Sequence, residues 1–528
     1  MALLATVVLV TAGDALAATA ATTPQRSTRQ TDDSAPIRVE DVTPWVAADG
    51  TFSVTLRTSD SIPADAALTW TVGQRIRADD GDLRAATAEF LAGDGSARNL
   101  QAPRTVALGT LEQVQPDTAG PPGDLRRLSF PIRPGSGDET AILVPTAGIH
   151  PVNLEVTAGD DVIWDSTVFL NRLPVDMPTT ADDTAGTTAV QLLVGLDSGP
   201  TLSVDQPAAI PTEEVPAVSS IQTLLGESLD LPLTVGLRPN TLLGLQRSER
   251  PADRAFVTSL VGAEWSFAPQ SYVRVDAAAL AAAPGDELQK QIAAGTSINA
   301  AVAGREPSTL WILDDTVDPA AAAVLESTGV THVITSAERL VVTEEGEDLG
   351  PSQAEAVLRS RSVLLDGTAA LSVSSYDVEL SRLLVEPGLE APLRAHRAVT
   401  ELMSEWLAAA GGADEGGFPP LSAAGVLTPG VGSEVLQRLA AMLSAEGPVQ
   451  IAAPPSGSDN PTAPLARLRE LDPASATSVV RTTPRTRDHI AGWRSMTTPT
   501  DEFAAELDLV NDQVPSRFID DGTRTALN

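Results

Sequence analysis

Apolar and polar residues alternate along short stretches of the chain between residues 36 and 175. These stretches are residues 52–56, 68–72, 128–132 and 152–156. A period of two is typical of strands that bury one face, and turn-forming pairs such as Asp49-Gly50 separate the stretches. We therefore expect residues 36–175 to form an Ig-like antiparallel β-sandwich with almost no helix.

Beyond about residue 190 the periodicity changes to short apolar runs that alternate with helical stretches. Residues 310–313 form one apolar run, followed by Asp318 as a helix N-cap and Pro319 at the first helical position. Gly329 is placed to end this helix before a second apolar run at residues 330–335. A strand, a helix and a strand in this order form a βαβ unit, which implies parallel strands.

The same order of elements recurs on both sides of this unit. Upstream, we expect strands at residues 233–237 and 272–275 and helices at residues 252–261 and 287–294, with Gly295 ending the second helix. Downstream, we expect helices at residues 399–407 and 435–443 and strands ending at Leu427 and covering residues 449–453. Alternation over about 270 residues fits an α/β barrel or a doubly wound sheet. The length and even spacing favour a degenerate (β/α) barrel of the glycosidase or deacetylase type.

The 528 residues are too many for one hydrophobic core, so several domains are expected. Residues 1–35 are expected to be a signal peptide and polar linker, 36–175 the Ig-like sandwich, 176–190 a linker, 191–465 the barrel-like α/β domain, and 466–528 an incomplete helical and polar segment. A Pro/Thr/Asp/Gly tract at residues 174–188 marks the main boundary.

The N-terminus has the features of an export signal. Residues 2–12 are apolar but too few to span a bilayer, and Ala15-Leu16-Ala17 supplies a cleavage site. Two features depart from the usual pattern, since no basic residue precedes the apolar run and Asp14 interrupts the approach to the cleavage site. A buried N-terminal helix is the alternative, but the polar tract that follows would continue a core element poorly. No other stretch is long and apolar enough for a transmembrane helix.

The amino-acid composition excludes some classes of binding partner and of chemical site. Seventy acidic against 35 basic side chains give a formal charge of −35. Such a polyanion repels phosphates, so we do not expect nucleic acid as a partner. The chain contains no cysteine, which excludes disulfides, thiolate metal sites and cysteine nucleophiles. No Walker loop, G-x-S-x-G elbow or H-E-x-x-H motif is present, so we expect no cofactor.

Candidate chemistry lies at the predicted strand ends, because the carboxyl ends of barrel strands form the active-site face. Asp314 and Asp315 directly follow one strand, Asp276 ends another with Arg274 two residues before it, and Glu264 opens a third. We take the three aspartates as catalytic candidates, and Arg274 and Glu264 as binding candidates. The alternative to a catalytic role is that an aspartate at a strand end caps the following helix, which is the commoner case. We expect the same capping role for Asp318.

The segment WILDDT is similar to the Asp-Asp motif of metal-dependent polysaccharide deacetylases. Those enzymes also need two histidines one helical turn apart to hold the metal. The four histidines are His150, His332, His396 and His489, and no two of them lie at that spacing. We therefore expect no metal site, and we interpret His332 as a hydrogen-bonded core histidine.

The signal-like start, the segment GIHPVNLEV and the segments SYVRVDAAAL and VDPAAAAVLESTGVTHVITS together resemble a family of large exported actinobacterial proteins of unknown function. These proteins are commonly encoded beside the MurJ-type (MviN) lipid II flippase. The resemblance covers residues 36–510, and its motifs are structural. It implies a cell-envelope location, outside the cytoplasm, and a connection with cell-wall assembly. In that family a further β domain and a membrane anchor follow, and no catalytic residues are established.

Two hypotheses of function follow from these observations. The first is a non-catalytic cell-envelope protein that binds a cell-wall glycan or a membrane-protein partner. The alternative is a carbohydrate-active hydrolase, similar to glycosidases or deacetylases, that uses Asp314, Asp315 and Asp276. A hydrolase needs two carboxylates about 5 to 10 Å apart in an open cleft, at least one with a shifted pKa.

Overall fold

The computed structural model shows a chain of more than one domain, built from both β-sheets and helices. The residues that it describes are 35–77, 83–92, 97–115, 123–132, 141–175, 188–198, 210–304, 306–312, 316–344, 346–350, 353–354, 357–358, 362–368, 371–411, 422–444, 447–452, 465–469, 485–491, 494 and 512. The predicted signal peptide and most of the predicted linker and C-terminal segment lie outside these residues.

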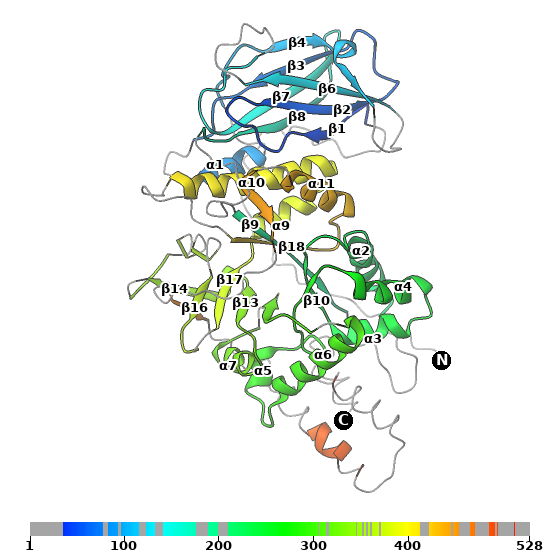
Figure 1. The fold of residues 1–528 in the computed structure, drawn as a ribbon, viewed down its shortest axis with the longest axis vertical. Coiled ribbons are helices and arrows are strands. Elements are labelled where there is room, and N and C mark those ends of the chain that lie inside the picture. Colours follow the sequence, from blue (N-terminus) through cyan, green and yellow to red (C-terminus); the bar gives the residue numbers. More distant parts are fainter. Residues whose placement is uncertain are drawn as a thin grey trace, which may run out of the picture.

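Two antiparallel sheets of four strands each form the N-terminal part of the molecule (Figure 1). The first has the order β1 (Ile37–Val42), β2 (Thr51–Thr58), β6 (Asp124–Pro131) and β5 (Glu112–Val114). The second has the order β4 (Arg104–Ala107), β3 (Ala67–Val72), β7 (Gly148–Ala158) and β8 (Asp161–Arg172). Alternate residues of both sheets meet in one buried cluster, in which Phe130 contacts Phe52 and stacks on Trp70. The period-two alternation in the sequence is therefore the inward face of these strands.

A helix also belongs to this part of the chain, although the alternation predicts almost none there. Helix α1 (Leu83–Leu91) follows β3, and it buries Thr87 and Leu91 against helix α10 (Ala391–Gly411). Its sequence LRAATAEFL consists mainly of good helix formers. The surface that stabilises it lies more than 300 residues away in the sequence, so local periodicity gives little indication of it.

Parallel strands form the centre of the second part. One sheet has the order β11 (Ser266–Phe267), β10 (Thr234–Leu237), β9 (Thr188–Leu196) and β18 (Ser422–Leu427), and β19 (Val449–Ile451) also pairs with β9. Another begins with β12 (Leu310–Ile312), β13 (His332–Thr335) and β17 (Ser372–Ser375). The pairs named here are all parallel.

Backbone hydrogen bonds join the two parallel sheets at both ends. The Ser308 amide donates to the Phe267 carbonyl over 2.6 Å, and the Asp377 amide donates to the Ala424 carbonyl over 2.7 Å. Inward-facing side chains of both sheets meet in one apolar cluster, which consists of Leu193, Ala268, Leu310, Ile312, Ile334 and Ala424. The two parallel sheets therefore share this apolar cluster.

Helices connect the parallel strands and cover them on the outside (Figure 1). They are α2 (Val215–Gly226), α3 (Pro239–Arg247), α4 (Pro251–Ser259), α5 (Ala277–Ala281), α6 (Glu287–Ala303), α7 (Pro319–Ser327), α9 (Val378–Val385), α10 and α11 (Ser433–Leu443). The predicted βαβ unit is confirmed. Asp318 caps α7 by accepting from the Ala321 amide, Pro319 occupies its first turn, and Gly329 follows with a φ of 91°. β12 and β13 then pair in parallel.

Two predicted elements near α6 are wrong in detail. Residues 272–275 are not a strand; the strand here is the short β11, and the following residues form a buried loop. Helix α6 does not end at Gly295 but runs on to Ala303, where Gly304 ends it with a φ of 68°. Gly295 is needed for another reason, because a Cβ at this position would overlap the Gln270 carbonyl oxygen. The glycine permits close approach of the helix to the loop.

A small, partly antiparallel extension was not predicted. Beyond β17, the sheet continues in the order β16 (Val363–Leu365), β20 (Leu465–Leu468), β14 (Leu340–Glu344) and β15 (Glu347–Asp348). β20 lies where the predicted barrel-like domain ends, and it pairs with both β14 and β16. The strands are short and polar on one face, which is why apolar runs did not reveal them.

Helix α10 connects the two parts of the molecule. It packs against β1, β7 and β8 of the N-terminal sheets and against α1, α9 and α11, and it lies between the sheets and the parallel strands in Figure 1. Every residue from 398 to 404 is buried. This central stretch is therefore enclosed on all sides, because both parts of the chain pack on it, whereas Ala408 near the end of the helix is exposed.

Replacement of Gly295 by Ala should lower the thermal unfolding midpoint. The methyl group must displace the Gln270 backbone, and overpacking of this kind costs about 1–3 kcal/mol. Gly226→Ala in α2 is the matched control, since nothing lies within 4 Å of a Cβ there. Unfolding followed by circular dichroism would measure both variants, and equal midpoints would contradict the close approach.

Candidate functional sites

Charged side chains meet at the carboxyl ends of two neighbouring parallel strands. Asp197 follows β9 and Arg238 follows β10. Asp197 lies between two arginines, with Oδ1 at 3.5 Å from Nε of Arg238 and Oδ2 at 3.9 Å from Nε of Arg274. Arg238 also donates from Nη1 to Oγ of Ser271 over 2.8 Å. The predicted binding residue Arg274 therefore belongs to an ion-pair group that includes Asp197, a residue not singled out in the sequence.

The predicted catalytic aspartates are only partly described. Asp276 is the N-cap of α5 and accepts from the Ala279 amide over 3.0 Å. It therefore has the helix-capping role that the sequence offered as the alternative to catalysis. Asp314 and Asp315 lie outside the described residues. The next described residue, Thr316, accepts through Oγ1 from the Ala277 amide over 2.8 Å. The loop that carries Asp276 therefore lies beside the chain that follows Asp315.

Glu264 lies away from these groups. Its side chain is exposed, and it precedes β11, so it is on the amino-terminal side of the strand, opposite the end where Arg238 follows β10. Its backbone amide donates to the Leu229 carbonyl. The structure therefore does not bring Glu264 together with Arg274 and Asp276.

A groove of about 350 Å³ lies between α2 and α4. Asp253 lies at its base, buried and held by Arg250 over 2.8 Å and by Gln222 over 3.4 Å. Ser219, Thr223 and Phe256 contribute hydroxyl and aromatic groups to its walls. Such a lining can hydrogen-bond a polar ligand.

His332 is buried between two serines of β17. Its Nδ1 lies 2.6 Å from Oγ of Ser372 and its Nε2 lies 2.9 Å from Oγ of Ser374. Because Ser372 donates its own proton to the Thr331 carbonyl, the Ser372 oxygen accepts from Nδ1 and Ser374 donates to Nε2. Burial lowers the pKa of His332 to about 4. The ring is thus neutral, with both nitrogens satisfied.

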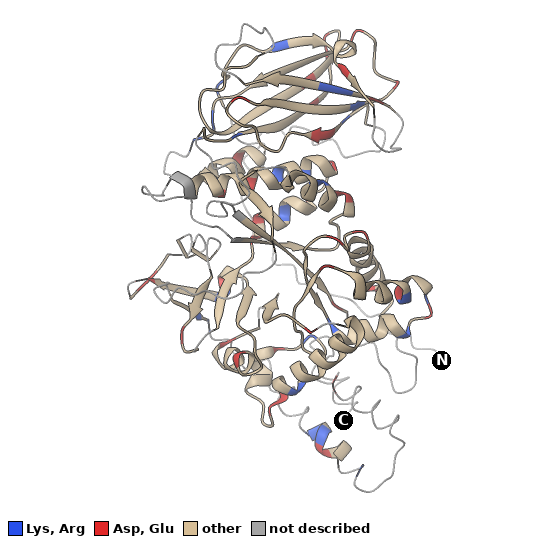
Figure 2. Cartoon of the chain, in the orientation of Figure 1, with Lys and Arg blue, Asp and Glu red and all other residues tan. Residues whose placement is uncertain are grey.

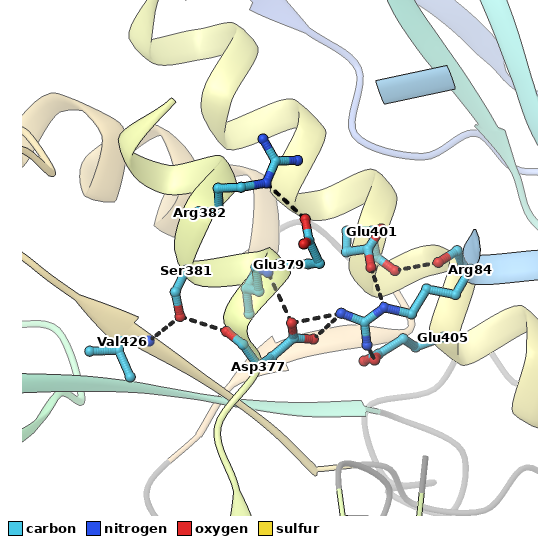
Figure 3. Close-up of polar contacts among 10 residues, drawn as sticks. Arg84, Asp377, Glu379, Ser381, Arg382, Glu401, Glu405 and Val426 are labelled. Atoms are coloured by element: carbon cyan, nitrogen blue, oxygen red, sulfur yellow. Dashed lines mark hydrogen bonds and ion pairs between the residues drawn. The ribbon is translucent and has the colours of Figure 1, made fainter. Parts of the chain in front are cut away.

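A second charged group lies at the boundary between the two parts of the molecule (Figure 3). Arg84 of α1 contacts three carboxylates from the other part of the chain, those of Asp377, Glu401 and Glu405. Nη2 lies 2.6 Å from Oδ2 of Asp377, Nε lies 2.5 Å from Oε1 of Glu401, and Nη1 contacts Glu405. Asp377 also caps α9 by accepting from the Leu380 amide.

Burial controls the protonation of this group. It raises the pKa of Glu401 to about 8 and that of Glu405 to about 7, although the positive charge of Arg84 acts in the opposite direction. Burial also lowers the pKa of Arg84, but Glu405, Asp377 and Glu401 outweigh this and raise it above its usual value. The guanidinium is therefore always charged, whereas the two glutamates titrate near neutral pH.

Two further titratable residues of this boundary bind backbone amides of the N-terminal sheets. His396 of α10 accepts through Nε2 from the Phe169 amide over 3.0 Å, and burial lowers the pKa of His396 to about 4. Glu390 accepts from the Val39 amide over 2.7 Å, and burial raises the pKa of Glu390 to about 7. Both bonds join residues more than 200 positions apart in the sequence.

The sequence contained a weak indication of the boundary group. Glu401 lies on the buried side of a helix whose neighbouring positions are Val399, Leu402 and Met403, and Glu405 lies one turn later. A carboxylate at an apolar position is costly to bury unless it is paired or protonated. Only the fold could identify Arg84 as its partner.

The described residues have neither a cluster of metal ligands nor a helix suited to span a membrane. They contain no group of three or more His, Asp or Glu side chains that could hold a metal ion. Within the same part of the chain, no helix combines the length and apolar character that a bilayer span requires. Charges of both signs are distributed over the molecule, including the layer of α10 and α11 (Figure 2).

No protein-family model matches the sequence, and no curated protein is significantly similar to it. Solved structures give distant matches. A 4-α-glucanotransferase from Thermococcus litoralis is 13% identical with a TM-score of 0.36, over 58% of this chain and 48% of that one, so the chain spans about half of that enzyme's length. The α-amylase AmyC from Thermotoga maritima is 9% identical with a TM-score of 0.40, over 64% and 96%.

A glycoside hydrolase/deacetylase from Parabacteroides distasonis, itself of unproven activity, is 12% identical with a TM-score of 0.26, over 48% of this chain and 63% of that one. At these identities and TM-scores, the likeness carries no argument about activity.

Acid should weaken the structure through His396. Its folded pKa lies below the ordinary value of 6.5, so the unfolded chain binds the proton more readily and stability falls as the pH drops below 6.5. His396→Gln keeps an acceptor for the Phe169 amide but does not titrate. We expect the variant to lose about 1–2 kcal/mol less stability than the parent between pH 7 and pH 5.

Denaturant unfolding at the two pH values would measure this difference, with the exposed His489→Gln as control. Equal pH dependence of the parent and His396→Gln would show that this histidine does not contribute.

Proposed function

We propose that the chain is an exported cell-envelope protein with a non-catalytic role, and that it binds a cell-wall glycan or a membrane-protein partner. In this proposal the two facing sheets are an Ig-like sandwich, and the parallel strands form a degenerate (β/α) barrel. The export signal and the family resemblance support the location. The fold and its strand ends support the absence of catalysis.

The proposal rests on the contacts that the carboxylates near the strand ends make. Asp276 and Asp318 cap helices, and Asp377 both caps α9 and pairs with Arg84. Asp197 lies between Arg238 and Arg274. A carboxylate whose oxygens are already engaged by helix amides or arginines is poorly placed to exchange a proton with a substrate.

The groove between α2 and α4 offers a surface for a polar ligand. Hydroxyl, amide and guanidinium groups at its rim match the hydrogen-bonding groups of a sugar, and Phe256 adds an apolar surface. The buried Asp253 fixes Arg250 and Gln222 in place. A site of this kind is ready for binding without large rearrangement.

A carbohydrate-active hydrolase is the second candidate. One observation favours it, namely the hydrogen bond between Ala277 and Thr316, which brings Asp276 close to the segment that follows Asp314 and Asp315. If Asp314 and Asp315 join Asp276 in one cleft, these aspartates could supply the acid and the base of a hydrolysis.

Replacement of both Asp314 and Asp315 by Asn distinguishes these functions. The parent protein should sediment with purified cell-wall sacculi and release no soluble sugar, and the double variant should bind within about twofold of the parent, since lost caps cost about 0.5–2 kcal/mol of stability and not of binding. Thr223→Trp, which would fill the groove, should reduce sedimentation; circular dichroism would verify folding.

Release of reducing sugar by the parent but not by the double variant would establish the hydrolase instead. Failure of the folded parent to sediment with sacculi would remove the glycan-binding proposal and leave a protein partner.

Export should be accompanied by cleavage after Ala17. The expected product begins at Ala18, because small residues at Ala15 and Ala17 fit the signal peptidase pattern. N-terminal sequencing of the protein from the cell envelope or the medium would test this. Ala15→Arg together with Ala17→Arg should block processing, and recovery of the parent with an intact Met1 in the cytoplasm would refute export.

A further inference from the structure

Three basic side chains lie together at one end of the second N-terminal sheet, where β7 begins and β8 ends. They are His150 of β7, Arg172 at the end of β8, and Arg75, which follows β3. Gly148 and Arg172 are directly opposite each other in the β7–β8 pair, so their side-chain positions share one face of the sheet. A Cβ on Gly148 would overlap the Arg75 side chain and lie 3.7 Å from its Nε. Arg75 therefore crosses over Gly148 and lies beside Arg172.

Neither arginine has a carboxylate partner among the residues that the structure describes. Arg172 is only 5% exposed, and its Nε is buried without a hydrogen-bond acceptor. Burial lowers the pKa of Arg172, and no described carboxylate acts in the opposite direction. Arg75 is exposed and donates from Nη1 to the Ala147 carbonyl over 3.4 Å. Two other buried arginines, Arg84 and Arg238, do pair with carboxylates, because an unpaired buried charge is costly.

His150 is buried beside the two arginines, and both of its ring nitrogens face carbonyl oxygens. Nδ1 lies 3.1 Å from the Gly73 oxygen and Nε2 lies 3.2 Å from the Thr146 oxygen. A neutral imidazole can donate to only one of them, whereas a protonated ring can donate to both. Burial lowers the pKa of His150, and the charges of Arg172 and Arg75 lower it further. A negative charge beside the arginines would offset their effect and favour the ring that satisfies both carbonyls.

We propose that this end of the sheet binds a phosphate group between the guanidinium groups of Arg75 and Arg172. A guanidinium is a planar fork of donors that suits the oxygens of an oxyanion. The two positive charges without a carboxylate match the charge of about −1.5 to −2 on a phosphate monoester near neutral pH, and they match the single charge of a carboxylate less well. The exposed Arg75 leaves the site open to solvent. This inference does not depend on the proposed function.

The negative charge of the whole chain does not exclude such a site. A formal charge of −35 repels long polyanions, but exposed charges farther apart than about 8 Å are largely screened at physiological ionic strength. A single phosphate group between two guanidinium groups therefore interacts mainly with its near neighbours. Carboxylates outnumber basic side chains 70 to 35 in this chain, so the chain could readily have supplied a partner for each arginine. The lack of one favours a ligand from outside the chain.

Titration of the whole chain with inorganic phosphate, followed by NMR of 13C-labelled histidine, would test the proposal. Exchange of chloride for phosphate keeps the ionic strength constant. The His150 signal, identified by its loss in His150→Gln, should shift in a saturable manner. Phosphate should also raise the pKa of His150, because the bound anion offsets the two guanidinium charges. The signal of His332, whose ring lies between two serines, should not respond.

Arg172→Met should weaken phosphate binding at least about tenfold, since it removes a charged donor but keeps an apolar stem. Because the guanidinium has no carboxylate partner, the variant should unfold in chloride at the temperature of the parent or above it. Phosphate should raise the thermal midpoint of the parent by about 2 °C or more over that of the variant. Arg75→Gln, a change at an exposed position, should also weaken binding without loss of stability.

Arg126→Met is the matched control, because Arg126 of β6 pairs with Asp124 over 2.9 Å; this variant should bind phosphate as the parent does. Glucuronate, which carries one carboxylate, is the comparison ligand, and tighter binding of glucuronate than of phosphate would overturn the assignment to phosphate. The absence of a saturable change at His150 would overturn the site itself. So would unchanged binding in Arg172→Met, or a marked loss of its stability in chloride, which would show that the chain already stabilises the guanidinium.

Discussion

Burial of helix α10 between the two parts of the molecule is the interaction on which the rest of the structure depends. One side of this helix completes the apolar core of the N-terminal sheets through Leu393, and another packs with the helices and parallel strands through Val399, Leu402 and Trp406. A fully buried side chain of this size contributes about 1.5–3 kcal/mol. Because both cores share one helix, neither part can shift without exposing apolar surface of the other.

The same constraint explains the polar residues of α10. The central part of this helix has no solvent-facing stripe, so the polar side chains there must find partners within the protein. His396, and Glu390 directly before the helix, accept from backbone amides of strands, Arg397 donates to a carbonyl of α1, and Glu401 pairs with Arg84. These bonds fix the register between parts that are far apart in the sequence. The carboxylates at the strand ends follow a similar logic, since helix amides or arginines occupy those that the structure describes.

The sequence allowed prediction wherever structure is determined locally. The unit from Leu310 to Thr335 was predicted correctly because its N-cap, first-turn proline and terminal glycine all lie within one short stretch. Arg274 and Asp276 were predicted at the end of a strand, but residues 272–275 form a loop and the strand β11 lies several residues earlier. Asp197 and Arg84 could not be recognised, because their importance arises from partners brought close only by folding. Gly295 was read as a helix end, since sequence alone cannot distinguish a terminating glycine from one that allows close contact.

The hydrogen bond between Phe169 and His396 limits how the chain can be divided for experiments. A fragment that ends before α10 would contain all eight strands of the N-terminal sheets, and sequence periodicity would describe it as a complete domain. It would nevertheless leave the Phe169 amide without its acceptor and expose Ile149 and Phe169, which now pack in the core shared with α10. Such a fragment would have an exposed apolar face and would tend to aggregate. Soluble pieces of this protein are therefore to be sought by cutting within loops of the second part, with α10 retained, rather than at the boundary between the two.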